Sequence, residues 1–370
     1  MRCLFISKRQ YTNKDLIDDR FGRCRELPLQ LSVLNHQVVG TCLSYKKKPE
    51  LIVQDSTDSA SVEWHSINAG RIKLLGAIRY TYYTYKLARR FRPDIIIATS
   101  DSIYGVIALI LARLLRKPYV FDLYDNYESF AAYKLPFMRI LYGSAIRNAN
   151  LITVVSEPLK QHILNIYKRK GPTVVLENGV DPKLFHPLPK NECRIAMGLP
   201  TEPKLIGVAG AISGSRGIGI VFAAFSELLA DWPDIRLVLA GKVDNDVEVN
   251  ASDNIIVLGE LPYEKMPQLI ASLDVSIVSN IDSPFGRYCY PQKFTEAIAT
   301  GTPTVVAAIG AMKTLLKDTP EILFRPGDAD DLVRAIRHQL VHGKIPGNPW
   351  NTWLDLARRL DHSINSMDQK

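Results

Sequence analysis

Two cations and a carboxylate stand close together in the stretch PFGRYCYPQKFTEAIATGTPTVVAA, residues 284–308. The cations are Arg287 and Lys293, and the carboxylate is Glu296. Basic side chains beside the free amides of a helix start favour an anion such as a phosphate. A carboxylate about one helical turn further on can accept hydrogen bonds from two vicinal hydroxyls, such as those of a ribose. The stretch therefore fits a nucleotide site, but it also fits a solvated helix with an ordinary surface glutamate.

The residue types in this stretch predict a short helix followed by a buried strand. Pro291 suits the first turn of a helix, Gly301 suits the left-handed position just past its end, and Pro303 prevents the helix from resuming. The β-branched and apolar residues 304–308 then predict a strand of a parallel sheet. The helix start is therefore expected at the carboxyl edge of a sheet, where α/β proteins bind ligands.

Strands alternate with helices along the whole chain, which predicts two successive doubly wound α/β domains with parallel sheets. Residues 188–192 (LPKNE) are interpreted as a linker between a first domain of residues 1–187 and a second of residues 188–349. An amphipathic helix is predicted near the end of the chain, within residues 350–370. The predicted strands cover residues 3–7, 37–43, 62–67, 94–100, 119–125, 151–156 and 173–179 in the first domain, and 205–210, 235–241, 254–260, 275–280 and 304–308 in the second.

Composition is that of a soluble globular protein, with 46% hydrophobic and 23% charged residues among 370. No apolar run reaches the roughly 18 residues that a membrane span needs. The nearest run, residues 103–115, contains Arg113 and predicts a buried helix. The first residues lack a long apolar region before a small-residue cleavage site, so we expect no secretory signal. Five scattered cysteines and seven histidines form no metal-ligand pattern, which predicts reduced thiols in the cytoplasm.

The net charge is concentrated in one half of the chain. Residues 1–185 contain 28 Lys and Arg against 16 Asp and Glu, a difference of +12, whereas the remainder contains 18 against 22, a difference of −4. The first half is therefore expected to face a polyanion. Residues 71–92 and 133–147 mix basic residues with tyrosine and leucine, as interfacial helices on anionic lipid do. The alternative is a helix that packs its tyrosines on the sheet, and nucleic acid is not expected because no binding motif accompanies the charge.

An ordered series of motifs occupies the second half: VLENGVDPKLFHP at 175–187, GAISGSRGI at 210–218, EAIATGTPTVV at 296–306 and LFRPGDADDLVRAI at 323–336. In this order they closely resemble the family 4 retaining glycosyltransferases, also called glycosyl transferases group 1. The resemblance implies the GT-B fold, in which two Rossmann-like domains face a central cleft and the last helix crosses back to complete the first domain. It also implies transfer of a sugar from a nucleotide-sugar to an acceptor, with the anomeric configuration retained.

The resemblance assigns the donor to the second domain. Glu296 matches the family's ribose-binding glutamate, while Tyr288 replaces the glutamate that usually contacts the sugar. Lys293 is expected beside the diphosphate and, with Arg216, to stabilise the leaving group. Ala211 replaces an arginine of the family's glycine-rich loop, so Lys293 and Arg287 are expected to carry more of the charge. The full expected donor set is Gly210, Arg216, Gly217, Leu258, Leu261, Arg287, Tyr288, Tyr290, Lys293 and Glu296, with the base near residues 258–261.

The acceptor is assigned to the first domain. Asp125 lies at the carboxyl end of the predicted strand 119–125, and it is the third expected catalytic residue, orienting the acceptor hydroxyl or accepting its proton. The alternative is an aspartate that caps the next segment. Gly22 allows close backbone approach, and Arg20 or Arg23 would meet a phosphate. The expected acceptor set is Arg20, Gly22, Arg23, Tyr124 and Glu128. The resemblance implies no bound metal and no cofactor.

The leading hypothesis is a retaining glycosyltransferase that makes a bacterial surface polysaccharide or glycolipid. The donor is expected to be a UDP-sugar, with a GDP-sugar as the second option, and the acceptor a lipid-linked or glycan molecule. The expected location is the cytoplasm, with peripheral docking on the inner face of the plasma membrane. Two alternatives are a nucleotide-sugar 2-epimerase of the same fold and a non-catalytic nucleotide-sugar-binding partner protein. The last is motivated by Tyr288 and Ala211.

Overall fold

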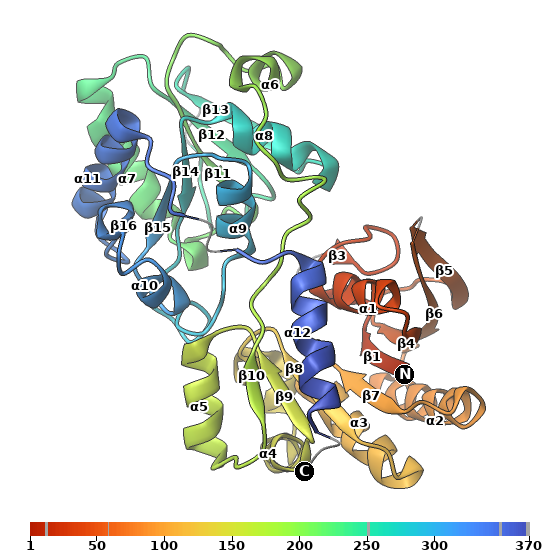
Figure 1. Ribbon diagram of the computed structural model, residues 1–370. Helices are drawn as coiled ribbons and strands as arrows, with labels where there is room; N and C mark the ends of the chain where they lie inside the picture. Colours follow the sequence, from red (N-terminus) through yellow and green to blue (C-terminus); the bar gives the residue numbers. More distant parts are fainter. Residues whose placement is uncertain (12–13, 58, 250–251, 348–349, 368–370) are drawn as a thin grey trace. The chain divides into compact units, whose positions relative to one another are not determined.

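The computed structural model contains two compact α/β units, each built on a parallel sheet with helices on both faces (Figure 1). It describes residues 1–11, 14–57, 59–249, 252–347 and 350–367. The first unit comprises Met1–Glu177 and Trp353–Lys370, and the second comprises Asn178–Thr352. The predicted pair of doubly wound α/β domains is confirmed.

The first sheet has eight strands in the order β10-β9-β8-β7-β1-β4-β6-β5, and β5 alone runs antiparallel to its neighbour. The strands are β1 (Arg2–Lys8), β4 (Gln37–Ser44), β5 (Leu51–Thr57), β6 (Ala60–Asn68), β7 (Ile95–Ala98), β8 (Tyr119–Leu123), β9 (Leu151–Val154) and β10 (Thr173–Val175). A separate small hairpin joins β2 (Gln10–Tyr11) to β3 (Lys14–Asp15). Strand β5 and the hairpin were not predicted, because β5 is a largely polar edge strand and the hairpin strands are very short.

Helices cover both faces of the first sheet. On one face α1 (Arg23–Val33) packs beside α12 (Trp353–Asn365), as Figure 1 shows. The expected return of the last helix to the first domain is thus confirmed, and Leu356 and Leu360 are buried in that core. Strand β4 shows the alternation, because Cys42 faces this core while the preceding Thr41 bonds Tyr80 of α2 on the other face. The remaining helices are α2 (Lys73–Phe91), α3 (Ser102–Leu115), α4 (Met138–Asn148) and α5 (Glu157–Tyr167).

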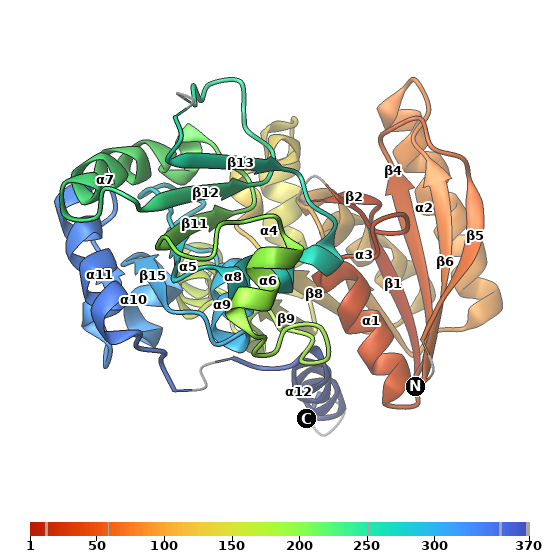
Figure 2. The ribbon, with the colours of Figure 1, turned by 90° about the horizontal axis from the view of Figure 1, so that it is seen from above.

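The second sheet has six parallel strands in the order β13-β12-β11-β14-β15-β16. They are β11 (Leu205–Ala209), β12 (Arg236–Ala240), β13 (Ile255–Gly259), β14 (Val275–Val278), β15 (Thr304–Ala307) and β16 (Leu323–Phe324). Figure 2 shows α7 (Ile218–Asp231) and α11 (Ala329–His342) on one side of the strands, and α6 (Lys190–Ala196), α8 (Met266–Ser272) and α9 (Gln292–Ala299) on the other. A short helix, α10 (Ala311–Leu315), follows β15.

The segment between the two units differs from the sequence-based interpretation. Residues 190–192, interpreted as a linker, begin α6, with Pro189 as its N-cap. The second unit also begins earlier than expected, at Asn178. Phe185 explains this, because its ring is buried in a cluster with Ile270 and Ala297. The predicted strand 173–179 accordingly stops at Val175.

Both sheets share the feature that places a ligand in doubly wound folds. The strand order reverses between β1 and β7 in the first sheet, and between β11 and β14 in the second. Helices on the two sides of such a switch point leave on opposite faces of the sheet, which opens a crevice at the carboxyl ends of the strands. The loops after these four strands are therefore where a site is sought.

Candidate functional site

Lys293 and Gly210 lie together at the switch point of the second sheet. Gly210 follows β11 with a left-handed φ of +102°, and Lys293 belongs to the first turn of α9. A Cβ at position 210 would lie 2.4 Å from Lys293 Cε and 2.6 Å from its Nζ. A side chain at position 210 would displace the ammonium from this place beside the backbone, and the φ value itself favours glycine.

Arg216 comes to the same switch point from the loop that follows Gly210. It ends a short 3-10 turn, Gly214–Arg216, and Gly217 with φ +76° turns the chain into α7. The guanidinium lies 3.8 Å from the centre of the Phe285 ring and donates to Asn280 Oδ1 at 3.4 Å. An aromatic face and an amide from the segment after β14 thus hold a cation that comes from the segment after β11.

The electrostatics at Lys293 favour an anion. Burial and, to a smaller extent, the nearby charge of Arg216 lower the pKa of Lys293 to about 8, while Glu296 acts in the opposite direction. Lys293 makes no hydrogen bond or ion pair with any residue that the structure describes. An enclosed ammonium beside a second cation is stabilised by an incoming negative group, which a phosphate would supply.

Glu296 is buried within the same helix, with 4% of its surface exposed. The Tyr263 hydroxyl donates to Glu296 Oε1 at 3.0 Å. Burial raises the pKa of Glu296 to about 7, while hydrogen bonds from Tyr263 and Gln292 act in the opposite direction. The alternative of a solvated surface glutamate is therefore wrong. The two carboxylate oxygens of Glu296 can accept hydrogen bonds from a pair of vicinal hydroxyls, and Lys293 next to them can bind a phosphate.

The local prediction for α9 is accurate to about one residue. Pro291 is the N-cap of α9 and not a residue of its first turn. Gly301 has the expected left-handed conformation, with φ +71°.

The other expected donor residues differ in their burial and in the partners that they contact. Arg287 is exposed and forms an ion pair with Asp282, so the described contacts do not bring it to Lys293. Tyr288 is half-buried, and Tyr290 is buried with its carbonyl accepting from Asn178. Leu258 and Leu261, the expected base contacts, pack partly buried against the cluster around Leu269. Asn280, Phe285 and Tyr263 were missed, because which side chain in a loop touches a site depends on the loop's path.

The switch point of the first sheet has a different chemistry. Arg23 is buried and donates to both oxygens of Asp122, with Nη2 to Oδ1 at 2.7 Å. Its remaining nitrogen donates to the carbonyls of Leu176 and Glu177. Asp122 also accepts from the hydroxyls of Thr99 and Thr153. The expectation that Arg23 meets a phosphate is therefore wrong, because its N–H groups already donate to Asp122 and to two backbone carbonyls of the same unit.

The expected acceptor residues before Arg23 occupy a tight turn. Arg20 is exposed with a left-handed φ of +46°. Gly22 has φ +78° and is the N-cap of α1. The Tyr11 hydroxyl lies only 2.3 Å from where a Cβ at position 22 would be, and it donates to the Phe21 carbonyl. Here the close approach that glycine permits is made by a residue of the same unit.

The acceptor residues after β8 form their own contacts. Asp125 is buried, and its Oδ1 accepts from the amide of Asn126, but the side chain that caps the following turn is that of Asn126. The Tyr124 hydroxyl donates to the Ser100 carbonyl at 3.3 Å. Glu128 accepts from His162 and from the Tyr167 hydroxyl. Burial would raise the pKa of Glu128, but these hydrogen bonds outweigh it and lower the pKa.

No group of three His, Cys, Asp or Glu side chains among the described residues could hold a metal ion. None of the described helices is both long enough and apolar enough to span a bilayer.

Comparison with known families adds to this geometry. Residues 203–342 match the family described as "Glycosyl transferases group 1", and residues 24–184 match "Glycosyltransferase Family 4". The structure resembles sucrose-phosphate synthase from Thermosynechococcus elongatus over 100% of this chain and 99% of that one, with a TM-score of 0.78 at 18% identity. It resembles Anabaena HepE in complex with UDP-glucose over 99% and 100%, with a TM-score of 0.72 at 18% identity. The fold is thus the GT-B fold of glycosyltransferases.

Relatives by sequence are glycosyltransferases as well. The 2-deoxystreptamine glucosyltransferase of Streptomyces kanamyceticus is 25% identical over 69% of this chain and 70% of its own length. The sulfoquinovosyl transferase SQD2 of Arabidopsis thaliana is 26% identical over 69% of this chain and 51% of its own length. A D-inositol 3-phosphate glycosyltransferase of Mycolicibacterium smegmatis is 25% identical over 50% of this chain, which spans 43% of that protein. The chain belongs to the family 4 glycosyltransferases and is a transferase enzyme.

Proposed function

We propose that this enzyme transfers a sugar from a UDP-sugar to a lipid-linked or polysaccharide acceptor, with retention of the anomeric configuration. The observation that carries the proposal is the pairing of Lys293, a half-buried lysine without a described anionic partner, with the buried carboxylate of Glu296. A diphosphate satisfies the first group and ribose hydroxyls satisfy the second. UDP is preferred over GDP because solved relatives of the same fold bind UDP and UDP-glucose.

The residues divide the chemistry between them. The bond from the anomeric carbon to the diphosphate breaks with its electron pair on the phosphate oxygen, and Lys293 and Arg216 stabilise the charge that builds there. The acceptor oxygen forms the new bond on the same face of the sugar. Its proton passes to Asp125, which acts as the base at the end of β8. The positive charge that a metal ion would supply comes from side chains and from the amides at the start of α9, so no metal or cofactor is required.

The acceptor and the location follow from the charge of the first half. A difference of +12 over residues 1–185 attracts an anionic membrane surface from the cytoplasmic side. A lipid-linked acceptor held at that surface is the substrate that such an enzyme meets during synthesis of bacterial surface glycans. This role is part of the proposal and is tested together with the donor.

The test is incubation of the protein with labelled UDP- and GDP-sugars and a bacterial membrane extract. Label from the UDP-sugar that enters lipid or glycan, with the anomeric configuration of the donor by NMR, supports the proposal. A changed sugar without acceptor would identify a 2-epimerase, and nucleotide binding without turnover would identify a non-catalytic partner protein; either contradicts it. Glu296→Ala is expected to abolish donor binding, and Glu264→Ala, an exposed glutamate beside Tyr263, is the matched control.

A further inference from the structure

Helices α2, α3 and α4 of the first unit carry only positive charge. Five Lys or Arg lie in α2, one lies in α3 and two lie in α4, and none of the three helices contains Asp or Glu. All eight side chains are exposed. The excess charge of the first half is thus concentrated on one group of helices, which gives it a definite place on the unit's surface.

The same helices expose large apolar side chains. Besides Leu75, six side chains on these helices and at the N-cap of α4 leave 57% to 77% of their surface uncovered: Leu74, Ile78, Tyr82, Leu114, Phe137 and Ile140. Leu74, Ile78 and Tyr82 recur every fourth residue, so they form one stripe along α2. Large apolar side chains left exposed on neighbouring helices indicate an interaction surface. We refer to these six residues and the groove below as the α2–α4 face.

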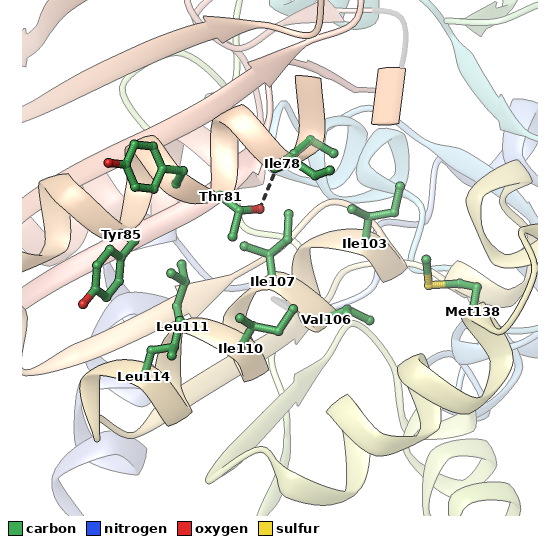
Figure 3. Close-up of a pocket in the computed structure, with 12 residues that line it drawn as sticks. Ile78, Thr81, Tyr85, Ile103, Val106, Ile107, Ile110, Leu111, Leu114 and Met138 are labelled. Atoms are coloured by element: carbon green, nitrogen blue, oxygen red, sulfur yellow. Dashed lines mark hydrogen bonds between the residues drawn. The ribbon is translucent and has the colours of Figure 1, made fainter. Parts of the chain in front are cut away.

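A groove of about 410 Å³ runs along this face between α2 and α3, from Met138 to Leu114 (Figure 3). Its lining is almost entirely hydrocarbon, and Ile78 and Ile107 face it from the two helices. The Thr81 hydroxyl donates to the Ala77 carbonyl at 2.8 Å, so it is satisfied within α2. An occupant of the groove therefore needs no hydrogen-bonding group, and a single alkyl chain meets that requirement.

Phe137 is the most exposed of the six, and its backbone conformation is strained. It has a left-handed φ of +61°, which is rare for a bulky residue, and it precedes α4 without a side-chain cap. Leu135, Ile140 and Leu141 beside it are exposed as well, and Lys134 and Arg139 flank them. Apolar residues at the tip of a loop, bordered by cations, have the chemistry of a segment that enters a bilayer below the level of the phosphates.

We propose that the α2–α4 face inserts into an anionic phospholipid bilayer, with Phe137 and Ile140 among the acyl chains and one acyl chain in the groove between α2 and α3. The charge favours this occupant over a second copy of the chain, because two such faces would bring together helices that carry Lys and Arg but no Asp or Glu. The proposal extends the membrane association proposed above from attraction to insertion. It does not depend on sugar transfer.

The first test is sedimentation of the full chain with vesicles of phosphatidylcholine alone or mixed with phosphatidylglycerol. We expect binding to the mixed vesicles that high salt weakens but does not abolish, since burial of apolar surface is not screened. The double variant Phe137→Ser, Ile140→Ser is expected to bind at least roughly tenfold more weakly. Binding that high salt abolishes completely would indicate electrostatic attraction without insertion and would overturn the proposal.

The control is the double variant Ile195→Ser, Val341→Ser, which removes two equally exposed apolar side chains from the second unit. It is expected to bind vesicles like the unaltered chain. Both double variants are expected to keep the thermal unfolding midpoint and the affinity for UDP. Equal binding by both would overturn the proposal, and a dimer that only the Phe137 variant loses would assign the face to a second copy.

Phe137→Trp gives a readout of depth. On mixed vesicles its fluorescence is expected to shift to the blue and to be quenched by brominated acyl chains, relative to the unaltered chain. No quenching would overturn insertion. Vesicle binding through this face by a protein that transfers no sugar would contradict the proposed function alone, and sugar transfer without vesicle binding would contradict this inference alone.

Discussion

The two sheets have switch points in the same topological position, but the cations at these points differ in whether they form ion pairs. At the first, Lys8 pairs with Asp101 at 3.7 Å, Arg9 with Asp15 at 2.9 Å and Arg23 with Asp122 at 2.7 Å. At the second, Lys293 has no ion pair with a described carboxylate, and Arg216 is stacked on Phe285. The fold therefore provides two similar crevices, and the placement of acids decides which one can take an anion.

This difference matches the division of labour proposed for the enzyme. A nucleotide diphosphate needs cations whose charge is still available, as at Lys293. An acceptor hydroxyl is uncharged, so it does not need a free cation. The ion-paired cations at the first switch point are compatible with such a group. Four substitutions test this difference between the two switch points.

The largest effect is expected in the first unit, from Arg23→Ala. It leaves the Asp122 carboxylate buried without its cation, which destabilises folding by about 3–5 kcal/mol. Urea unfolding of the full chain measures this, and Arg20→Ala, its exposed neighbour, is expected to change little. A stable Arg23→Ala protein with a raised KM for acceptor would show that Arg23 is available for binding and would contradict the difference between the two switch points.

In the second unit, Lys293→Ala is expected to lower kcat/KM for the UDP-sugar by about 10²- to 10³-fold, because one donor to the leaving group is lost. Folding stability is expected to stay or rise, since an enclosed ammonium is removed. Steady-state kinetics and urea unfolding measure the two effects, with the exposed Lys317→Ala as control. Lys293→Ala kinetics like those of the control would remove Lys293 from the site.

The next effect depends on pH and involves Glu296. Burial raises the pKa of Glu296 to about 7 from its ordinary 4.5, so the folded state keeps a proton that the unfolded state has lost between these values. Wild-type stability is therefore lost as pH rises from about 4.5 to 7, relative to Glu296→Gln, which does not titrate. The variant is expected to be more stable by roughly 1 to 3 kcal/mol above pH 7 and nearly equal near pH 4.5.

Urea unfolding of wild type and Glu296→Gln at several pH values provides the measurement. The same variant is expected to bind UDP roughly tenfold more weakly, because its amide NH₂ replaces one acceptor oxygen. A stability difference that does not change with pH would contradict the buried, protonated carboxyl.

The smallest effect is expected from Phe285→Leu, which removes the aromatic face under Arg216. Loss of a cation–π contact of about 0.5–1 kcal/mol weakens UDP binding roughly three- to fivefold. Isothermal titration of UDP measures it, and Phe222→Leu on α7 is the control for a half-buried phenylalanine. An unchanged affinity would mean that the Phe285 contact does not hold Arg216 for the donor.

Local signals in the sequence were enough for the second unit's framework. Gly301 and Pro303 defined the end of α9, and the β-branched residues after them defined β15, because each depends on conformational limits of single residues. The burial of Glu296 was left open by the sequence, which also fitted an ordinary surface glutamate. Even so, Arg287 was misplaced, since its pairing with Asp282 depends on the exact turn of an exposed loop.

Long-range pairings were beyond sequence reasoning. Arg23 and Asp122 pair only because the strand order brings α1 and β8 together. The sequence of neither segment indicates that the other is its partner. The boundary near residue 187 was missed for a similar reason, because Phe185 finds its partners in α8 and α9. A charge count could find the basic half, but only packing shows that its apolar residues remain on the surface.

The packing of α12 on α1 has a consequence for the order of synthesis. Residues 353–365 complete the core of the first unit, yet they leave the ribosome after every residue of the second unit. The amino-terminal half must therefore wait, with its α1 surface uncovered, while about half of the chain is translated. A premature stop shortly before residue 353 would spare all the described strands and helices of the second unit and leave the first unit permanently unfinished.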